Sequence, residues 1–264
     1  MTRLSYDDYH RHLGAESARL RAVLADCDPR ARVPSCPEWD AADLLGHHAR
    51  VLHFWATIIE QRPAGPEDLD DPELPAAYDA RLELHAQQAA RLAAALTTAD
   101  PADAAWTWST EQTVGFTFRR QAHEALIHRL DAELTAGEVT PLDPALAADG
   151  VDEALDVMFG GCPPWGTFTP YDRFVRVDVT DTDDTVWVQL GHFDGVDPDD
   201  GREHDSEDIH VVADPGVDAD AVVSGPAGPL DAWLWRRGGD SEVTVTGDPT
   251  ASTHFRGCVS HPIN

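Results

Sequence analysis

The stretch Arg119–Glu133, RRQAHEALIHRLDAE, contains eight ionisable side chains in fifteen residues. On a helix, Glu124 and His128 stand one turn apart, separated by about 40° around the helix axis. A mostly apolar stripe lies beside them and consists of His123, Leu126, Ile127, Leu130 and Leu134. The pattern is typical of a charged surface helix, and it also fits a bundle helix that presents two metal ligands beside its apolar face.

The rest of the first half also has helical periodicity. Apolar residues recur at 3- and 4-residue spacings, and breaks rich in Gly, Pro or Asp separate the periodic segments. The four long helices predicted in this way are 6–25, 41–61, 75–97 and 114–135. They indicate an up-and-down four-helix bundle. A fifth helix is predicted at 144–159, before the break Gly160–Pro164.

The periodicity changes after this break. Short segments that alternate or are rich in β-branched residues predict strands at 174–181, 185–191, 208–214, 220–225 and 242–247. A helix is predicted at 226–237, and an acidic loop at 193–208. We therefore expect a two-domain α+β chain, with a helical bundle at 1–160 and a small α+β domain with a mostly antiparallel sheet at 161–264.

Composition excludes several classes of function. The chain has 48 acidic and 19 basic residues and a formal net charge of −29, which opposes binding to nucleic acid. It contains no apolar run long enough for a membrane span, and its first residues lack the apolar segment of a signal peptide. We expect a cytoplasmic protein, a monomer or small homo-oligomer, whose partners are small molecules.

A metal site is one interpretation of the Glu124 and His128 pair. A carboxylate and an imidazole suit a borderline divalent ion such as zinc, and a catalytic zinc site needs a third protein ligand. The predicted helix 41–61 offers adjacent histidines, His47 and His48, within an apolar stripe, where an imidazole is costly unless it is bonded, ligated or exposed. Periodicity alone does not choose between them.

Four motifs occur in a recognisable order along the chain. They are VPSCPEWDAADLLGHHARV (33–51), TVGFTFRRQAHEALIHRLDAE (113–133), LAADGVDEALDV (146–157), and SGPAGPLDAWLWRR (224–237) with VTVTGD (243–248). Together they resemble the mycothiol-dependent maleylpyruvate isomerase family. The resemblance spans both halves and implies a DinB-like helical bundle followed by a small α+β domain.

The resemblance also implies a set of site residues. The family's metal ligands fall on His47, Glu124 and His128, with zinc as the expected ion. Asp131 would accept a hydrogen bond from a ligating imidazole. The family's L-W-x-R element places its active-site arginine at Arg237, as a catalytic and cofactor-binding residue, and the adjacent Arg236 could bind the cofactor in its place.

The implied chemistry is activation of mycothiol as a thiolate by the bound metal. In the family's isomerase reaction the thiolate adds to the cis double bond of maleylpyruvate, allows rotation, and leaves. The same thiolate could attack another small electrophile and remain there, which is an S-transferase reaction. Two alternatives stay open: a non-catalytic module that binds a metal or a thiol metabolite, and a thiol-exchange enzyme of natural-product biosynthesis.

Overall fold

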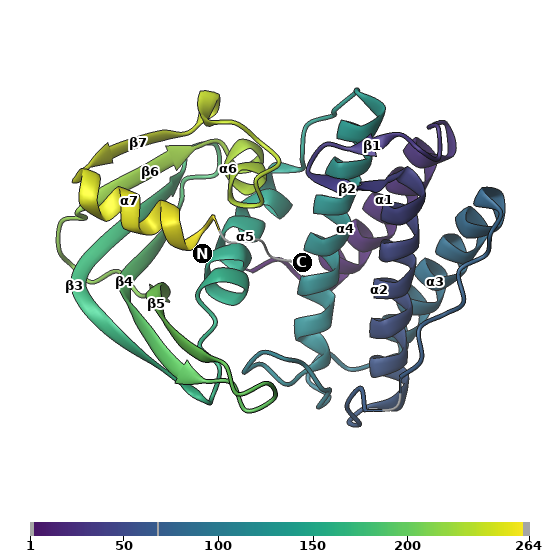
Figure 1. The fold of residues 1–264 in the computed structure, drawn as a ribbon, viewed down its shortest axis with the longest axis horizontal. Helices are drawn as coiled ribbons and strands as arrows, with labels where there is room; N and C mark the ends of the chain where they lie inside the picture. The colour runs from purple at the N-terminus through teal and green to yellow at the C-terminus, as the bar shows by residue number, and fades with distance from the viewer. Residues whose placement is uncertain (1–2, 68, 261–264) are drawn as a thin grey trace. The chain divides into compact units, whose positions relative to one another are not determined.

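A computed structural model describes residues 3–67 and 69–260 of the chain. The chain divides into two compact units, Leu4–Pro141 and a second unit that consists of the described residues from Leu142 onward together with those before Leu4. The first is helical, and the second contains a five-stranded sheet with helices (Figure 1). Within the described residues, no helix is long and apolar enough to cross a membrane.

Four long helices form the first unit, which confirms the predicted helical bundle. They are α1 (Tyr6–Ala25), α2 (Ala41–Gln61), α3 (Tyr78–Thr98) and α4 (Val114–Ala136). Helix α1 packs mainly against α4, and α2 packs mainly against α3, with further contacts between α2 and α4. Leucine and isoleucine side chains from these helices are fully buried, including Leu20, Leu24, Leu44, Leu52 and Ile58.

Local signals fix the ends of the two helices that carry the candidate ligands. Asp40 and Asp43 form a reciprocal capping box at the start of α2. Thr113 caps the start of α4, because its hydroxyl accepts a hydrogen bond from the backbone N–H of Phe116. Gly137 ends α4 in the left-handed conformation, with φ of 78°.

A small hairpin in the loop between α1 and α2 was not predicted. It pairs β1 (Arg32–Val33) with β2 (Cys36–Asp40) in antiparallel fashion. Val33 is fully buried and packs in a cluster with Leu20, Leu24 and Leu44. The apolar contact of Val33 therefore anchors the hairpin to the bundle core.

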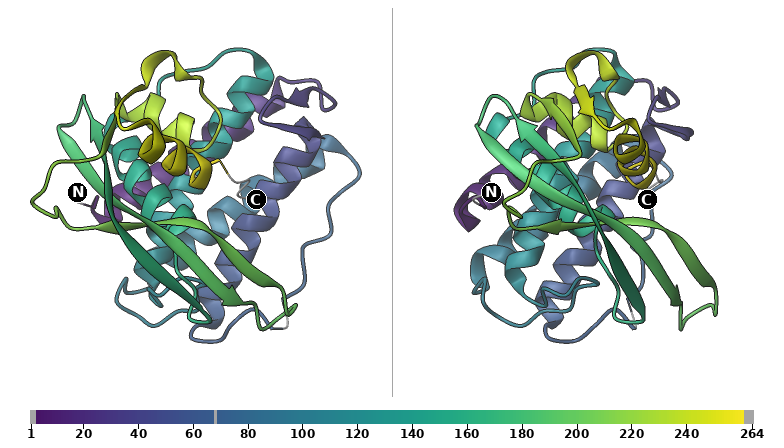
Figure 2. Two further views of the ribbon diagram at one scale, coloured as in Figure 1. Left: turned by 60° about the vertical axis from the view of Figure 1, so that its left-hand side comes forward. Right: turned by 90° about the vertical axis from the view of Figure 1, so that its left-hand side faces the viewer.

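The second unit is built on a sheet with strand order β5-β4-β3-β6-β7. Its strands are β3 (Gly166–Val179), β4 (Asp184–Val196), β5 (Glu203–Val212), β6 (Ala221–Gly225) and β7 (Thr244–Gly247). Only β3 and β6 pair in parallel, so the predicted mostly antiparallel sheet is confirmed. Figure 2 shows how strongly the sheet twists along β3 and β4.

Helices of the second unit pack on this sheet and on each other. Helix α5 (Pro144–Glu153) continues into a π-helix at Ala154–Phe159, and it packs against α6 (Ala227–Leu234). This packing places α5 in the second unit, so the boundary between the compact units follows Pro141, whereas the sequence placed a domain boundary at residue 160. Helix α7 (Pro249–Cys258) contacts all five strands and was not predicted.

The predicted acidic loop at 193–208 is mostly strand. Strands β4 and β5 extend toward each other until only residues 197–202 remain between them. Asp194 pairs with Asp205, and His192 pairs with Glu207, in the extended part of the ladder. Backbone hydrogen bonds hold this part of the hairpin while most of its acidic side chains stay in solvent.

Candidate metal centre

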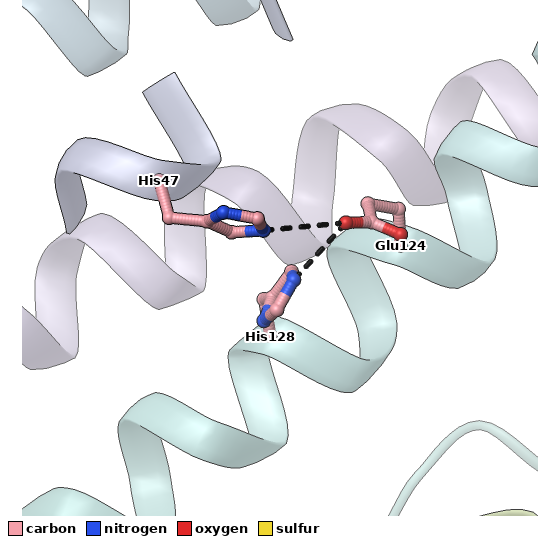
Figure 3. A group of neighbouring side chains, drawn as sticks. All are labelled: His47, Glu124 and His128. Carbon is pink, nitrogen blue, oxygen red and sulfur yellow. Dashed lines mark hydrogen bonds and ion pairs between the residues drawn. The ribbon is translucent and has the colours of Figure 1, made fainter. Parts of the chain in front are cut away.

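Three side chains of the first unit meet between α2 and α4. Figure 3 shows His47 on α2 pointing toward Glu124 and His128 on α4. Each offers one donor atom, and these atoms all lie within 4.8 Å of one another. In the part of the chain that the structure describes, this is the one group of three or more His, Cys, Asp or Glu side chains close enough to hold a metal ion.

The spacing of the donors suits a divalent ion. Nε2 of His128 lies 3.0 Å from Oε1 of Glu124, and Nε2 of His47 lies 3.9 Å from the same oxygen. Ligand atoms at about 2.0 Å from a tetrahedral zinc ion are about 3.3 Å apart, between these two distances. Two imidazoles and one carboxylate are also a donor set that zinc takes in catalytic sites. The three side chains therefore fit a zinc-type ion after small movements.

A carboxylate behind His128 fixes the orientation of its ring. Oδ2 of Asp131 lies 3.0 Å from Nδ1 of His128, and the Asp131 side chain is fully buried. Ser35, in the turn of the β1–β2 hairpin, donates its hydroxyl proton to the other carboxylate oxygen of Asp131. A proton held on Nδ1 by Asp131 leaves the Nε2 lone pair of His128 directed at the candidate ion.

Neighbouring side chains also stabilise the negative charge of Glu124. Arg120, one turn earlier on α4, donates to Oε2 of Glu124 at 2.9 Å and leaves Oε1 facing the histidines. Burial alone would raise the pKa of Glu124, but His128, His47 and Arg120 outweigh it and hold that pKa well below its usual range. Glu124 is therefore a carboxylate at neutral pH, as a metal ligand must be.

His128 has the opposite shift. Burial would lower its pKa, yet Glu124 and Asp131 together raise the pKa of His128 to about 9. The ring of His128 is therefore stabilised in its protonated form, because the nearby carboxylates favour a positive charge at this position. A divalent ion satisfies the same two carboxylates and would replace the proton on Nε2.

His48, next to His47 on α2, lies in a different environment. Nδ1 of His48 is 2.8 Å from Nε2 of His85 on α3, and both rings are buried. Burial, reinforced by the neighbouring His85 and His128, lowers the pKa of His48 well below its ordinary value. In the described residues neither ring is hydrogen-bonded to a carboxylate, and burial lowers the pKa of both, so His48 and His85 form a neutral pair in the bundle interior.

The two arginines singled out in the sequence follow α6 in the second unit. Arg236 is exposed and has a left-handed backbone, with φ of 60°, and Arg237 donates from Nη1 to the carbonyl oxygen of Trp235 at 2.8 Å. Their role toward a cofactor stays a prediction.

Sequence reasoning missed two members of the site. Ser35 lies within the first of the four motifs, but a serine in a predicted loop gives no signal of a carboxylate 96 residues away. Arg120 could have been found, because it stands four residues before Glu124 on a predicted helix.

Comparisons with known proteins cover almost the whole chain. Residues 10–133 match the family described as the mycothiol maleylpyruvate isomerase N-terminal domain, and residues 145–253 match the MDMPI C-terminal domain. The gap between the two matches contains the boundary between the compact units. No curated protein matches the sequence.

Two solved structures share the fold. They are the crystal structures of a mycothiol-dependent maleylpyruvate isomerase and of a histidine-to-alanine mutant of it. Each aligns with a TM-score of 0.58 at 15% identity and covers 95% of this chain and 97% of the other. Both domain matches lie in the expected order and account for both units of the structure. The chain therefore belongs to the mycothiol-dependent maleylpyruvate isomerase family.

Proposed function

We propose that the protein is a divalent-metal enzyme that activates the thiol of mycothiol for attack on a small electrophile. Cis-trans isomerisation of a maleylpyruvate-type substrate is the first reaction to test, because the family and the solved structures carry that name. S-transfer to another electrophile uses the same activated thiol and is the second candidate.

The observation that carries the proposal is the meeting of His47, Glu124 and His128, with Asp131 behind the ring of His128. A buried carboxylate hydrogen-bonded to the far nitrogen of a histidine is the usual support of a ligating imidazole. The other buried histidine pair, His48 and His85, has no such carboxylate. The distinction favours a metal centre over a histidine cluster that only packs.

A bound zinc-type ion would lower the pKa of a coordinating thiol and so supply a thiolate at neutral pH. The protein's own residues then have defined tasks. Glu124 and the two imidazoles hold the ion, while Arg120 keeps one oxygen of Glu124 turned away from it. Of the three ligand side chains, that of His47 is the most exposed, at 32%, against 19% for Glu124 and 10% for His128.

Arg237, or Arg236 in its place, is proposed to bind the carboxylate of the substrate or of the thiol cofactor. A guanidinium group is suited to this task because it donates two parallel hydrogen bonds to a carboxylate. The net charge of the chain, −29, disfavours anions near its surface, so a local arginine would help an anionic substrate to bind.

Mass spectrometry of the zinc-loaded protein with mycothiol and a panel of electrophiles that includes maleylpyruvate tests the proposal. Isomerised product with the thiol regenerated identifies an isomerase, and a stable mycothiol adduct identifies an S-transferase. The matched control is the Glu124→Gln variant, which keeps the shape of the side chain but removes its charge and is expected to lose turnover.

Two results would contradict the proposal. If the protein binds zinc and mycothiol but turns over no electrophile in the panel, the non-catalytic binding module is the better description. If turnover persists unchanged in Glu124→Gln, the reaction does not depend on this centre. A thiol-exchange role in natural-product biosynthesis would appear as transfer of the thiol between adducts instead of release of an isomer.

A further inference from the structure

A cavity of about 530 Å³ lies in the second unit beside α7, built from residues that the proposed function does not use. Val223, Val245 and Phe255 give it apolar surface, Trp233 and Arg256 lie beside them, and the rest of its lining is polar or small and includes the carboxylate of Asp240. These residues come from β6, β7, α6 and α7, all within one compact unit. Its volume is in the range of small-molecule sites, roughly 300–1,000 Å³.

The cationic group of this cavity is held in a fixed position. The guanidinium carbon of Arg256 lies 3.7 Å from the centre of a Trp233 ring, which is stacking distance. The indole N–H of Trp233 donates to Oδ1 of Asp240 at 2.6 Å, and this bond fixes the plane of the ring. Arg256 is thus a preorganised cation on an aromatic surface.

Arg256 lacks a hydrogen-bond partner where one is needed. Its Nη1 atom is buried and makes no hydrogen bond to any described residue. Burial lowers the pKa of Arg256, and the positive charge of Arg236 acts in the same direction, while Asp240 acts against it. Buried donors without a partner are rare in native proteins, and a charged one is especially costly.

A second arginine over an indole shows the contrast. Arg176 lies 5.9 Å from the centre of a Trp187 ring, and it donates to both carboxylate oxygens of Asp178 at 2.9 to 3.1 Å. Its charge is matched within the protein. Arg256 has the closer aromatic contact and, among the described residues, no carboxylate hydrogen-bonded to its guanidinium, although the charge of Asp240 acts on it.

We propose that this cavity binds a small monocarboxylate with an apolar body. The carboxylate accepts hydrogen bonds from the guanidinium of Arg256, and the apolar part packs against Val223, Val245 and Trp233. A single negative charge fits better than a phosphate, because the carboxylate of Asp240 is close to Arg256 and the chain is strongly acidic. The site goes beyond the proposed function, since it shares no residue with the metal centre.

Isothermal titration calorimetry on the full-length, zinc-loaded protein tests the site, with phenylbutyrate and its neutral analogue phenylbutanamide as probes. We expect saturable one-site binding of phenylbutyrate and binding of the amide weaker by about tenfold or more, as for loss of one charge-assisted contact. Arg256→Met keeps the apolar stem over Trp233 and should weaken phenylbutyrate by a similar factor. Arg176→Met is the matched control and should bind phenylbutyrate like the unaltered protein.

The outcomes separate this site from the metal centre. Phenylbutyrate affinity should persist in His47→Gln, because a carboxylate bound at the metal would lose affinity there instead. No saturable binding, equal affinity for acid and amide, or unchanged affinity in Arg256→Met would each overturn the proposal. If Arg256→Met does not fold, Arg256→Lys keeps the charge but loses the planar fork. It should show a smaller loss of phenylbutyrate affinity and a reduced but still measurable preference for acid over amide, and equal affinity for the two in this variant would overturn the proposal.

Discussion

His47 and His48 are adjacent on α2, yet their imidazoles have opposite surroundings. His47 faces a carboxylate, Glu124, and keeps about a third of its side chain in solvent. His48 turns into the bundle, is fully buried, and shares a hydrogen bond with another histidine, His85. Successive residues on a helix point about 100° apart, so His47 reaches Glu124 on α4 while His48 reaches His85 on α3.

The difference shows what makes a histidine cluster suitable for a metal. Near Glu124 and Asp131, the pKa of His128 is raised to about 9, because carboxylates favour positive charge. In the inner pair, burial lowers the pKa of His85 to about 4. The first environment accepts a cation and the second rejects one, although the two are so close that the rings of His48 and His128 have centres 5.7 Å apart.

The strongest test of this contrast is a pair of matched substitutions, His47→Gln and His48→Gln. We expect His47→Gln to lower zinc affinity by more than the roughly 10–100-fold that loss of a supporting partner causes, because it removes a ligand itself. His48→Gln should keep zinc affinity within a few-fold. Competition with a fluorescent chelator, together with elemental analysis of the dialysed proteins, measures both.

Circular dichroism of both variants controls for folding, since His48 is buried and a polar substitution there disturbs packing. Equal loss of zinc in the two variants would mean that the centre does not distinguish the adjacent histidines. Retention of zinc in both would remove His47 from the ligand set.

The inner pair can be tested by pH. The folded pKa of His85, about 4, lies below the value of about 6.5 expected for the unfolded chain, so the unfolded state binds more protons between these values. Stability therefore falls as pH falls through this window. From about pH 7 to about pH 5 the expected loss from His85 is at most about 2 kcal/mol.

Urea unfolding of the unaltered protein and of His85→Gln at both pH values measures this loss. His85→Gln should be less stable near neutral pH, because the substitution disturbs packing. Between pH 7 and pH 5 its free energy of unfolding should fall by less than that of the unaltered protein, and the difference should be at most about 2 kcal/mol. The same pH dependence in both proteins would contradict a neutral inner pair.

Periodicity predicted the helices of the site and left the third ligand open between His47 and His48, and the family resemblance implied His47. The i,i+4 spacing of Glu124 and His128 follows from helix geometry alone. The choice between His47 and His48 depends on how α2 is rotated in the bundle, which a single apolar stripe does not define to within one residue. Ser35 acts on Asp131 across 96 residues of sequence, and no local pattern carries such a contact.

The fold was predicted best where periodicity is long. All four bundle helices start or end within a few residues of the predicted bounds. Helix α7 was missed although Asp248 and Pro249 are a standard start signal, because a helix of ten residues with mixed composition is too short to show a clear period. The extended β4–β5 hairpin was missed because acidic composition predicts solvent exposure, which strand residues at an edge can also have.

Arg236 and Arg237 are adjacent, like His47 and His48, and again only one of the two is expected to be functional. The expected effect of substitution on stability is smaller here. Arg236 occupies the left-handed position after α6, where its N–H donates to the carbonyl of Trp233 and the N–H of Arg237 donates to that of Ala232. This is the Schellman pattern, in which glycine is usual at the left-handed residue. Arg236 therefore holds a conformation that is costly for any residue with a Cβ.

Arg236→Gly should raise the free energy of unfolding by about 1 kcal/mol relative to Arg236→Ala, because only glycine relieves the left-handed strain while both remove the side chain. Urea unfolding of the two variants measures the difference, and equal stability would mean that the backbone at 236 relaxes away from φ of 60°. Turnover of the same two variants then shows which arginine is functional. If it is Arg237, Arg236→Gly should be the more stable variant and should keep its activity. If it is Arg236, the strained backbone serves to place its guanidinium, and Arg236→Gly and Arg236→Ala should both lose activity.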